Sequence, residues 1–256
     1  MVARGALQRK QEIDRVERFL ERDSLLNFHI TSTLLHERAE VVGLAESGEA
    51  VVGAAIATPS ASGKPSLLRF DAIGPVALQR LLASLRERPA RLMLHRPWQG
   101  AVIEREIGPL EVRSVVEMFS AGPHAFTALA DPRVRELTPA DVARALEQAP
   151  SWILELLRDH LARGWHAFGA YVDGSLAAHV CCGYRTETSE EICHLYTTPE
   201  QRGRGLATAV VGVAARAIVA RGHQPVYFSR SVNKASQRVA LCSGFHRVSS
   251  LQEVAV

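Results

Sequence analysis

The sequence has no long apolar segment. None of its apolar runs approaches the roughly 18 residues that a membrane-spanning helix needs. The N-terminal stretch Met1–Gly5 lacks the apolar core of a signal peptide. These absences favour a cytoplasmic protein with no membrane partner.

Cysteines are few, and their spacing fits neither a CxxC pair nor a zinc site. Cys181 and Cys182 are adjacent, and neighbouring cysteines pair poorly with each other. We expect reduced, half-buried thiols for this pair and for Cys193 and Cys242, and we expect no metal.

Acidic residues are missing from one long part of the chain. Between Gln201 and Gln252 there is no Asp or Glu, although the formal net charge of the whole chain is only +3. The basic residues of this span are Arg202, Arg204, Arg216, Arg221, Arg230, Arg238, Arg247 and Lys234. A field of one sign favours an anionic ligand. Aromatic side chains for base stacking are sparse there, which indicates a compact phosphorylated ligand and no nucleic acid.

The two halves of the chain repeat each other. At an offset of 126 residues (169 − 43 = 174 − 48), Gly43 meets Gly169 and Gly48 meets Gly174. Toward the end of each half the offset becomes 136 (244 − 108), and the matched pairs are Gly108/Gly244, Val112/Val248, Ser114/Ser250 and Glu117/Glu253. We predict two α/β domains, at residues 1–125 and 126–256, each of a common domain size.

Each half is predicted to follow the order helix–helix–hairpin–strand–helix–strand–helix–strand. In the first half we expect the second helix to start at Ser24, a favoured N-cap residue. In the second half, Thr138-Pro139-Ala140-Asp141 indicates a capped helix start, and Asp173-Gly174 predicts a type I′ hairpin turn.

One loop of the second half has no counterpart in the first. The apolar run Ile192 to Thr197 predicts a strand, Pro199 ends it, and Arg202-Gly203-Arg204-Gly205 leads into an Ala/Val-rich helix. Glycines there let backbone N–H groups approach a ligand, and the helix start adds a positive dipole end. The first half has Val76-Ala77-Leu78-Gln79 at the aligned positions, so we expect only the second half to bind the anion.

Two other kinds of phosphate-binding loop fit the sequence less well. The motif G-x-x-x-x-G-K-[ST] is absent, which argues against a P-loop NTPase. The run from Gly203 to Thr208 misses the third Gly or Ala of the dinucleotide fingerprint, and the acidic residue expected about 20 positions later is absent. A purely structural glycine turn remains an alternative.

Two motifs resemble the GNAT acyltransferase superfamily. The run from Arg202 to Ala207 fits its R/Q-x-x-G-x-G/A signature, and the run from Asn233 to Phe245 resembles its late Asn-to-Gly-Phe segment. The resemblance covers roughly Arg133 to Val256 and reaches the first half only through the repeat. It implies two tandem GNAT-like α/β units, the N-terminal one degenerate, each a mixed, mostly antiparallel twisted sheet flanked by helices. It also implies that the C-terminal sheet splays between its fourth and fifth strands, at Ile192–Thr197 and Pro225–Arg230.

The same resemblance implies acyl-coenzyme A, with acetyl-CoA as the donor, in that split. Strand backbone would pair with the pantetheine arm, the loop amides would hold the pyrophosphate, and two side chains of the late segment would lie beside the thioester end. The implied binding residues are Leu195, Tyr196, Thr197, Arg202, Gly203, Arg204, Gly205, Leu206, Ala207, Asn233 and Ser236.

Acyl transfer to an amine needs a group that takes a proton from the amine. The candidate catalytic residues are His194 and Glu191, and Glu190 or a water relay would also serve. Strict alternation would put Glu190 and His194 on one strand face and Glu191 on the other. The alternative is that both glutamates are exposed carboxylates at a hairpin end and that His194 is an ordinary strand residue.

The usual general acid of the resembled superfamily is missing. Many members carry a Tyr seven residues after the Asn, and 233 + 7 is Ala240 here. Cys242 or Tyr196 would be substitutes, although Cys242 fits a helix-packing role better. This departure puts the acid in doubt, not the binding of coenzyme A.

The sequence therefore predicts an N-acetyltransferase that moves an acetyl group from acetyl-CoA to a primary amine of a small molecule or a protein by direct attack. The alternative is a non-catalytic module that binds acyl-CoA or another protein. We expect the first half to complete the substrate cleft or to pack the core. Monomer and homodimer both remain open, and the sequence does not identify the amine.

Overall fold

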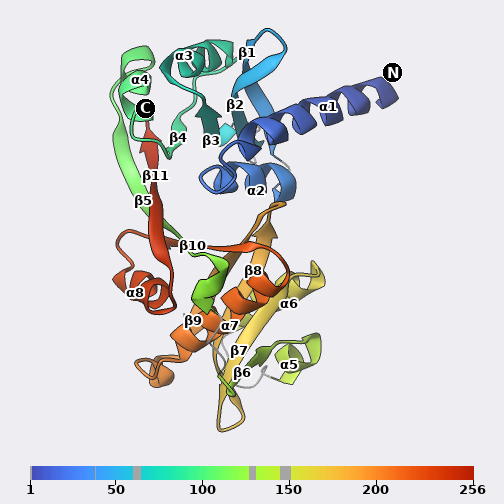
Figure 1. The fold of residues 1–256 in the computed structure, drawn as a ribbon, viewed down its shortest axis with the longest axis vertical. Helices are drawn as coiled ribbons and strands as arrows, with labels where there is room; N and C mark the ends of the chain where they lie inside the picture. The colour runs from blue at the N-terminus through green and yellow to red at the C-terminus, as the bar shows by residue number, and fades with distance from the viewer. Residues whose placement is uncertain (1, 38, 60–64, 127–130, 145–150) are drawn as a thin grey trace. The chain divides into compact units, whose positions relative to one another are not determined.

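Figure 1 shows the computed structural model, which describes residues 2–37, 39–59, 65–126, 131–144 and 151–256. The chain divides into two compact units. Unit 1 comprises the residues up to Val116 together with Ser249–Val256, and unit 2 comprises Glu117–Val248.

Unit 1 contains a sheet in the order β1-β2-β3-β4-β11. Its elements are α1 (Val2–Glu21), α2 (Phe28–His36), β1 (Glu40–Ser47), β2 (Ala50–Pro59), β3 (Pro65–Ala72), α3 (Pro75–Ser84), β4 (Arg91–Leu94), α4 (Gln99–Glu106), the first part of β5 (Glu111–Ser120) and the last part of β11 (His246–Ala255). β3 and β4 pair in parallel, and the pairs β1–β2, β2–β3 and β4–β11 are antiparallel.

Helices cover both faces of the sheet in unit 1. Leu20 of α1 and Ile30 of α2 pack in one apolar cluster with Ile56 of β2. Leu78 of α3 and Ile103 of α4 belong to a second cluster, which takes the alternate residues of β2. Because successive strand side chains point to opposite faces, the two clusters lie on opposite sides of the sheet. All five of these side chains are at most 1% exposed, and each contributes about 1.5–3 kcal/mol of burial free energy.

Unit 2 has the sheet order β5-β10-β9-β8-β7-β6. Its elements are the end of β5, the 3-10 turn η1 (Pro123–Phe126), β6 (Val134–Glu136), α5 (Pro139–Arg144), α6 (Ser151–Ala162), β7 (His166–Val172), β8 (Ser175–Arg185), β9 (Ser189–Thr197), η3 (Pro199–Gln201), α7 (Leu206–Ala220), β10 (Gln224–Arg230), α8 (Lys234–Cys242) and the start of β11. β9 and β10 pair in parallel, and the pairs β6–β7, β7–β8 and β8–β9 are antiparallel.

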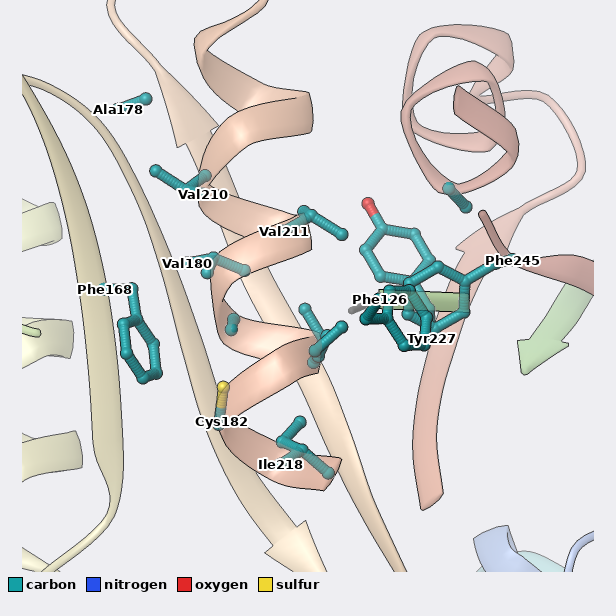
Figure 2. Packing of buried hydrophobic residues seen from close by; sticks show 14 of the residues in the cluster. Phe126, Phe168, Ala178, Val180, Cys182, Val210, Val211, Ile218, Tyr227 and Phe245 are labelled. Atoms are coloured by element: carbon teal, nitrogen blue, oxygen red, sulfur yellow. The ribbon is translucent and has the colours of Figure 1, made fainter. Parts of the chain in front are cut away.

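Helix α7 is at the centre of the main core of unit 2 (Figure 2). Its side chains Val210, Val211 and Ile218 lie between strand residues such as Phe168 and the aromatic ring of Tyr227. Helices α5 and α6 pack on the opposite sheet face, in a separate cluster with Ala167 and Cys181. The order of layers therefore matches that of unit 1.

The predicted repeat is confirmed by the order of the elements. The series from α1 to β5 and the series from α5 to β11 have the same sequence of helices and strands. Shifting the bounds of α4 by 136 residues gives 235–242, one residue short of α8 at its start. The fold is thus the predicted tandem arrangement of two mixed α/β units.

The last strand of each repeat lies beside the other repeat's sheet strands. β5, which ends the first repeat, neighbours β10 of the second, and β11, which ends the second, neighbours β4 of the first. Gln252 to Ala255 of β11 pair with Leu94 to Arg91 of β4. The predicted division at residues 125 and 126 assigned residues 249–256 to the C-terminal domain, whereas their strand pairing with β4 places them in compact unit 1.

Several local predictions can be compared directly with the structure. The side chain of Thr138 accepts from the Asp141 amide (3.3 Å), and Asp141 accepts from the Thr138 amide (2.9 Å), so the predicted cap of α5 is a reciprocal capping box. Asp173 and Gly174 both have positive φ, as a type I′ turn requires. The predicted start of α2 at Ser24 is wrong: the helix begins at Phe28, after a turn that Asn27 holds by donating to the Leu20 carbonyl (2.9 Å).

None of the described helices is both long and apolar enough to span a bilayer.

Candidate functional site

A cleft opens in unit 2 where two parallel strands part. β9 pairs with β10 only from Ser189–Gln224 to Ile192–Tyr227. From Cys193 onward, the β9 edge that faces β10 has no strand partner, and unpaired strand edges offer backbone N–H and C=O groups to an extended ligand. The predicted splay of this sheet is therefore present, at the predicted strands.

The cleft has a volume of about 1010 Å³, at the upper end of the range of about 300–1,000 Å³ for small-molecule sites. It is lined by β9, the Gly-rich loop, β10 and α8. The lining residues are Ile192, Cys193, His194, Leu195, Tyr196, Thr197, Gln201, Arg202, Gly203, Gly205, Leu206, Ala207, Thr208, Tyr227, Phe228, Ser229, Arg230, Asn233, Ala235, Ser236, Arg238, Val239 and Cys242. We call this space the β9–β10 cleft.

The Gly-rich loop brings free backbone amides to the cleft. Gly203 and Gly205 both have φ +76°, a left-handed conformation that other L-residues rarely adopt. Helix α7 begins directly afterwards at Leu206, and the Ala209 amide donates to the Gly205 carbonyl (3.0 Å). The preceding helix amides, up to Thr208, have no helical acceptor because the first turn of any helix leaves its N–H groups unpaired. Loop and helix start together form an anion-binding arrangement.

The charge of the cleft wall is positive. Arg202, Arg230 and Arg238 line it, and its described lining contains no carboxylate. Arg202 also donates from Nε to the Thr197 carbonyl (3.3 Å), which ties the loop to the end of β9. Arg204 instead donates to the side chain of Gln201 and lies outside the lining.

The wall formed by α8 begins with a side-chain cap. Asn233 precedes the helix, and its Oδ1 accepts from the Ser236 amide (3.1 Å). Ser236 Oγ lies 2.7 Å from the phenol oxygen of Tyr227 on β10. Burial raises the pKa of Tyr227, so its phenol stays protonated at neutral pH.

His194 occupies a bulge in β9. Between the partners Cys181–Cys193 and His179–Tyr196, β9 has one residue more than β8, and His194 has φ +53°. The strict alternation predicted for β9 is therefore wrong beyond Cys193, because the extra residue changes the direction of the side chains that follow. A non-glycine residue in this conformation is strained, and such strain concentrates at functional positions.

Two further histidines lie close to the bulge. The ring of His160 is 6.2 Å from that of His194, and the ring of His179 is 5.8 Å from that of Tyr196. Burial lowers the pKa of His179 to about 4, with a smaller contribution from the charges of His194 and His160. Desolvation also lowers the pKa of His194. His194 is thus a neutral imidazole at pH 7 and can accept a proton.

The two glutamates of β9 lie on the closed part of the strand. Glu190 is 2% exposed and accepts from Arg221 Nη2 (2.8 Å), so the prediction of an exposed carboxylate is wrong for this residue. Glu191 is half-buried, opposite Val226 in the β9–β10 pairing, and lies outside the lining of the cleft. Of the two candidate bases, only His194 lines the cleft.

All four cysteines are free. Cys181 and Cys182 are fully buried, whereas Cys242 is exposed and lines the cleft, so the predicted helix-packing role of Cys242 is wrong. Cys193 also lines the cleft, and burial raises its pKa well above the usual thiol range.

Several residues of the cleft were not singled out from the sequence. They are Tyr227, Phe228, Ser229, Arg230, Val239 and Arg238. The sequence placed them in the predicted strand Pro225–Arg230 and in the run from Asn233 to Phe245, but it did not show which side chains face the cleft, because contacts between β10 and α8 depend on the fold and not on a local pattern. Among the described residues, no group of three His, Cys, Asp or Glu side chains is arranged to hold a metal ion.

In unit 1 the equivalent strands β3 and β4 also part after a short pairing, but charged side chains lie beyond it. β3 pairs with β4 only at Leu68–Leu92 and Arg69–Met93. Just beyond this pairing lies Asp71, which is fully buried and hydrogen-bonded to Arg96 and Arg22. In unit 1 a charged network therefore occupies the position in the fold that corresponds to the cleft of unit 2.

The family comparison concerns unit 2. Residues 132–245 match the sequence profile of the acetyltransferase (GNAT) family. One curated relative, described as an uncharacterized N-acetyltransferase in the mutA 5′ region of Streptomyces virginiae, is 37% identical over 94 residues. That match spans 35% of this chain and only 40% of the relative's length.

Solved structures of similar fold cover nearly the whole chain. A tandem GNAT protein from the clavulanic acid biosynthesis pathway covers 96% of this chain and 95% of its own, with a TM-score of 0.59 and 14% identity. An acetyltransferase from the GNAT family of Colwellia psychrerythraea covers 90% and 89%, with a TM-score of 0.60 and 15% identity. At these identities the likeness concerns the fold, and it confirms the tandem GNAT-like architecture.

Proposed function

Since residues 132–245 belong to the acetyltransferase (GNAT) family, we propose that the protein is an N-acyltransferase that moves an acetyl group from acetyl-CoA to a primary amine. The observation that carries the proposal is the β9–β10 cleft, which joins an open strand edge to a positively charged loop at a helix start. An extended arm that ends in a polyphosphate suits both parts of this cleft at once.

Each end of the cleft supports one part of the donor. The pyrophosphate would lie on the amides of Gly203, Arg204, Gly205, Leu206 and Ala207. Arg202, whose amide donates to the Pro199 carbonyl (3.3 Å), would contribute the charge of its side chain. The pantetheine arm would follow the open edge of β9 at Leu195, Tyr196 and Thr197. Its thioester end would then reach Asn233 and Ser236 at the start of α8.

The acceptor amine must lose a proton before or during attack on the thioester carbonyl. We assign this proton to His194, because it lines the cleft and its lowered pKa keeps the ring neutral. Glu191 is the second candidate and would act from the closed part of β9, through water. Direct attack by the amine is favoured over an acyl-cysteine intermediate, because the raised pKa of Cys193 keeps that thiol protonated and weakly nucleophilic.

Binding of acetyl-CoA by calorimetry, followed by release of free thiol across a panel of amines, tests the proposal. We expect binding, and turnover with at least one amine. Binding without turnover on any amine would favour the alternative, a non-catalytic acyl-CoA-binding or protein-interaction module. Absence of acetyl-CoA binding would overturn the proposal and leave only a protein-interaction module.

A matched pair of arginine variants separates the cleft from general charge. Arg238 lines the cleft, whereas Arg216 is an exposed residue of α7 outside its lining. Both Arg238→Gln and Arg216→Gln remove one positive charge. We expect only Arg238→Gln to weaken acetyl-CoA binding, by about tenfold if it contacts a phosphate.

The remaining expectations stay part of the proposal. They are a cytoplasmic location, acyl-CoA and an amine as the only required partners, no metal, and a monomer or homodimer. The free state of all four cysteines supports a reducing compartment.

A further inference from the structure

Two hydroxyl groups share one hydrogen bond on the wall of the β9–β10 cleft. Tyr227 Oη of β10 and Ser236 Oγ of α8 lie 2.7 Å apart, and both residues line the cleft. Tyr227 is 2% exposed, whereas Ser236 is half-buried. The serine is therefore the member of the pair that is nearer to the open space.

The pair has one more hydrogen than its shared bond uses. Each hydroxyl can donate once. Within the described part of the chain, this contact is the one hydrogen bond that either hydroxyl group makes. When Tyr227 donates to Ser236, the O–H of Ser236 has to point elsewhere. The cleft is the space that Ser236 borders, so its hydrogen is available to a ligand there.

Packing of the Tyr227 ring fixes its hydroxyl in the direction of Ser236. Its ring lies 6.0 Å from that of Phe245 and 6.5 Å from that of Phe119, all in the same buried cluster as Ala240. In Figure 2 the phenol oxygen of Tyr227 points away from the rings of Phe126 and Phe245. Ala240 is one helical turn after Ser236, on the same side of α8, and its small side chain leaves room for the Tyr227 ring.

We propose that Ser236 donates a hydrogen bond from its hydroxyl to the sulfur of coenzyme A as the thioester breaks, and that Tyr227 positions Ser236 for this by donating to the serine oxygen. The inference rests on the proposed function, because it requires the thioester end of the donor to reach the start of α8. It assigns to Ser236 a catalytic contact and to Tyr227 a positioning role.

The chemistry balances without a further reactant. The amine nitrogen forms a bond to the acyl carbon, the carbon–sulfur bond breaks, and sulfur leaves with the electron pair as a thiolate. The hydrogen bond from Ser236 stabilises that negative charge as it develops. The proton lost by the amine passes through the base to solvent, and the released thiolate takes a proton from solvent.

Coenzyme A itself is the probe, so the test does not depend on knowing the amine. The thiolate of bound coenzyme A absorbs in the ultraviolet, and titrating this band gives the acid dissociation constant of the bound thiol. A donor that favours the thiolate raises this constant. We expect it to fall about tenfold in Ser236→Ala and by at least about threefold in Tyr227→Phe.

Two control variants and two check measurements make the test specific. Ser236→Thr keeps a hydroxyl and should retain the wild-type constant within about twofold. Tyr184→Phe removes the hydroxyl of another unit 2 tyrosine, whose ring lies tilted 5.1 Å from that of Trp165 outside the cleft lining, and should leave the constant unchanged. Thermal unfolding and the dissociation constant of coenzyme A confirm that each variant is folded and loaded.

The outcomes are distinct. Loaded variants Ser236→Ala and Tyr227→Phe with wild-type thiol ionisation would overturn this inference and leave the proposed function standing. A wild-type protein that does not bind coenzyme A would overturn both. A shift in Ser236→Ala with none in Tyr227→Phe would overturn the positioning role of Tyr227.

Discussion

Arg96 holds the buried carboxylate of Asp71 with two hydrogen bonds, Nε to Oδ1 at 2.7 Å and Nη2 to Oδ2 at 2.8 Å. Arg22 donates to the same carboxylate, and His95 Nε2 lies 3.4 Å from Oδ1. The side chain of Asp71 has no exposed surface. This network joins the end of α1, the end of β3 and the residues after β4, and we infer that it stabilises unit 1.

Replacing Asp71 should therefore destabilise unit 1 strongly. Asp71→Asn leaves two guanidinium groups without their shared counter-charge, and we expect a loss of about 3 kcal/mol in the free energy of unfolding. Denaturant unfolding measures this loss. Asp131→Asn is the control, because it breaks a partly exposed pair with Arg133 and should cost at most about 1 kcal/mol. Equal losses in both variants would contradict the importance of burial.

The contribution of Asp71 to the free energy of unfolding should depend on pH in one direction. Burial alone would raise the pKa of Asp71, but interactions with His95, Arg96 and Arg22 outweigh it and hold the pKa well below its ordinary value near 4. A depressed carboxyl pKa stabilises the fold above that ordinary value, and the contribution is lost as pH falls through the folded-state pKa. The difference in unfolding free energy between wild type and Asp71→Asn should be constant above pH ~4 and shrink below it.

The positive φ of His194 predicts an unusual ranking of two variants. Alanine at this position keeps the strain of a left-handed residue, whereas glycine relieves it. We expect His194→Gly to be more stable than His194→Ala by about 1 kcal/mol, although glycine normally weakens a strand. Thermal or denaturant unfolding of the two variants decides the matter, and a more stable alanine variant would show that the backbone relaxes there.

The role of His194 as base predicts the pH dependence of turnover. A neutral imidazole is required, so kcat/KM should fall as pH drops through the His194 pKa, which desolvation places below 6.5. His194→Gln should lose most activity at neutral pH, by about 100-fold, and should lose this acid limb. A limb that persists in the glutamine variant would assign the proton transfer to another group, Glu191 among them.

Gly203 and Gly122 form a matched pair for the Gly-rich loop. A Cβ at either position would meet no atom within 4 Å, but only Gly203 has a left-handed φ. Gly203→Ala should therefore lower the free energy of unfolding by about 1 kcal/mol and weaken acetyl-CoA binding, while Gly122→Ala should do neither. Calorimetric binding and thermal unfolding measure the two effects. Unchanged binding in the folded Gly203→Ala variant would argue against amide contacts at this loop.

Local sequence patterns predicted the parts of the site that depend on neighbouring residues. The turn at Asp173-Gly174, the capping box of Thr138 and the Gly-rich start of α7 each arise from interactions within a few residues. Such interactions leave a direct signature in residue type and spacing. The positions of β9 and β10 followed from the same kind of pattern.

Interactions between distant residues had no such signature. Glu190 meets Arg221 across 31 positions, and the strict alternation expected for β9 gave no sign of the extra residue at His194. The hydroxyl pair of Tyr227 and Ser236 depends on how α8 packs against β10. The repeat predicted a last strand for each half. Because the two halves offer equivalent neighbouring strands, the sequence pattern did not decide which half each last strand pairs with.

Because the end of β11 pairs with β4 in unit 1, a deletion of residues 249–256 should affect unit 1 and not unit 2. Removing residues 249–256 deletes the strand segment that pairs with β4, while every residue that lines the cleft remains. Hydrogen exchange should rise at the β4 amides of Arg91–Leu94 and stay low at those of β8 (Ser175–Arg185) in unit 2. Unchanged protection of β4 would mean that this pairing contributes little to unit 1.

The pairing of β11 with β4 has a consequence for synthesis on the ribosome. β4 is translated more than 150 residues before its partner, since Arg91 is opposite Ala255. Until residues 252–255 leave the exit tunnel, the edge of β4 that pairs with them lacks its native partner strand. Synthesis of unit 1 thus starts before that of unit 2, but the sheet of unit 1 is completed only by residues that are made after unit 2.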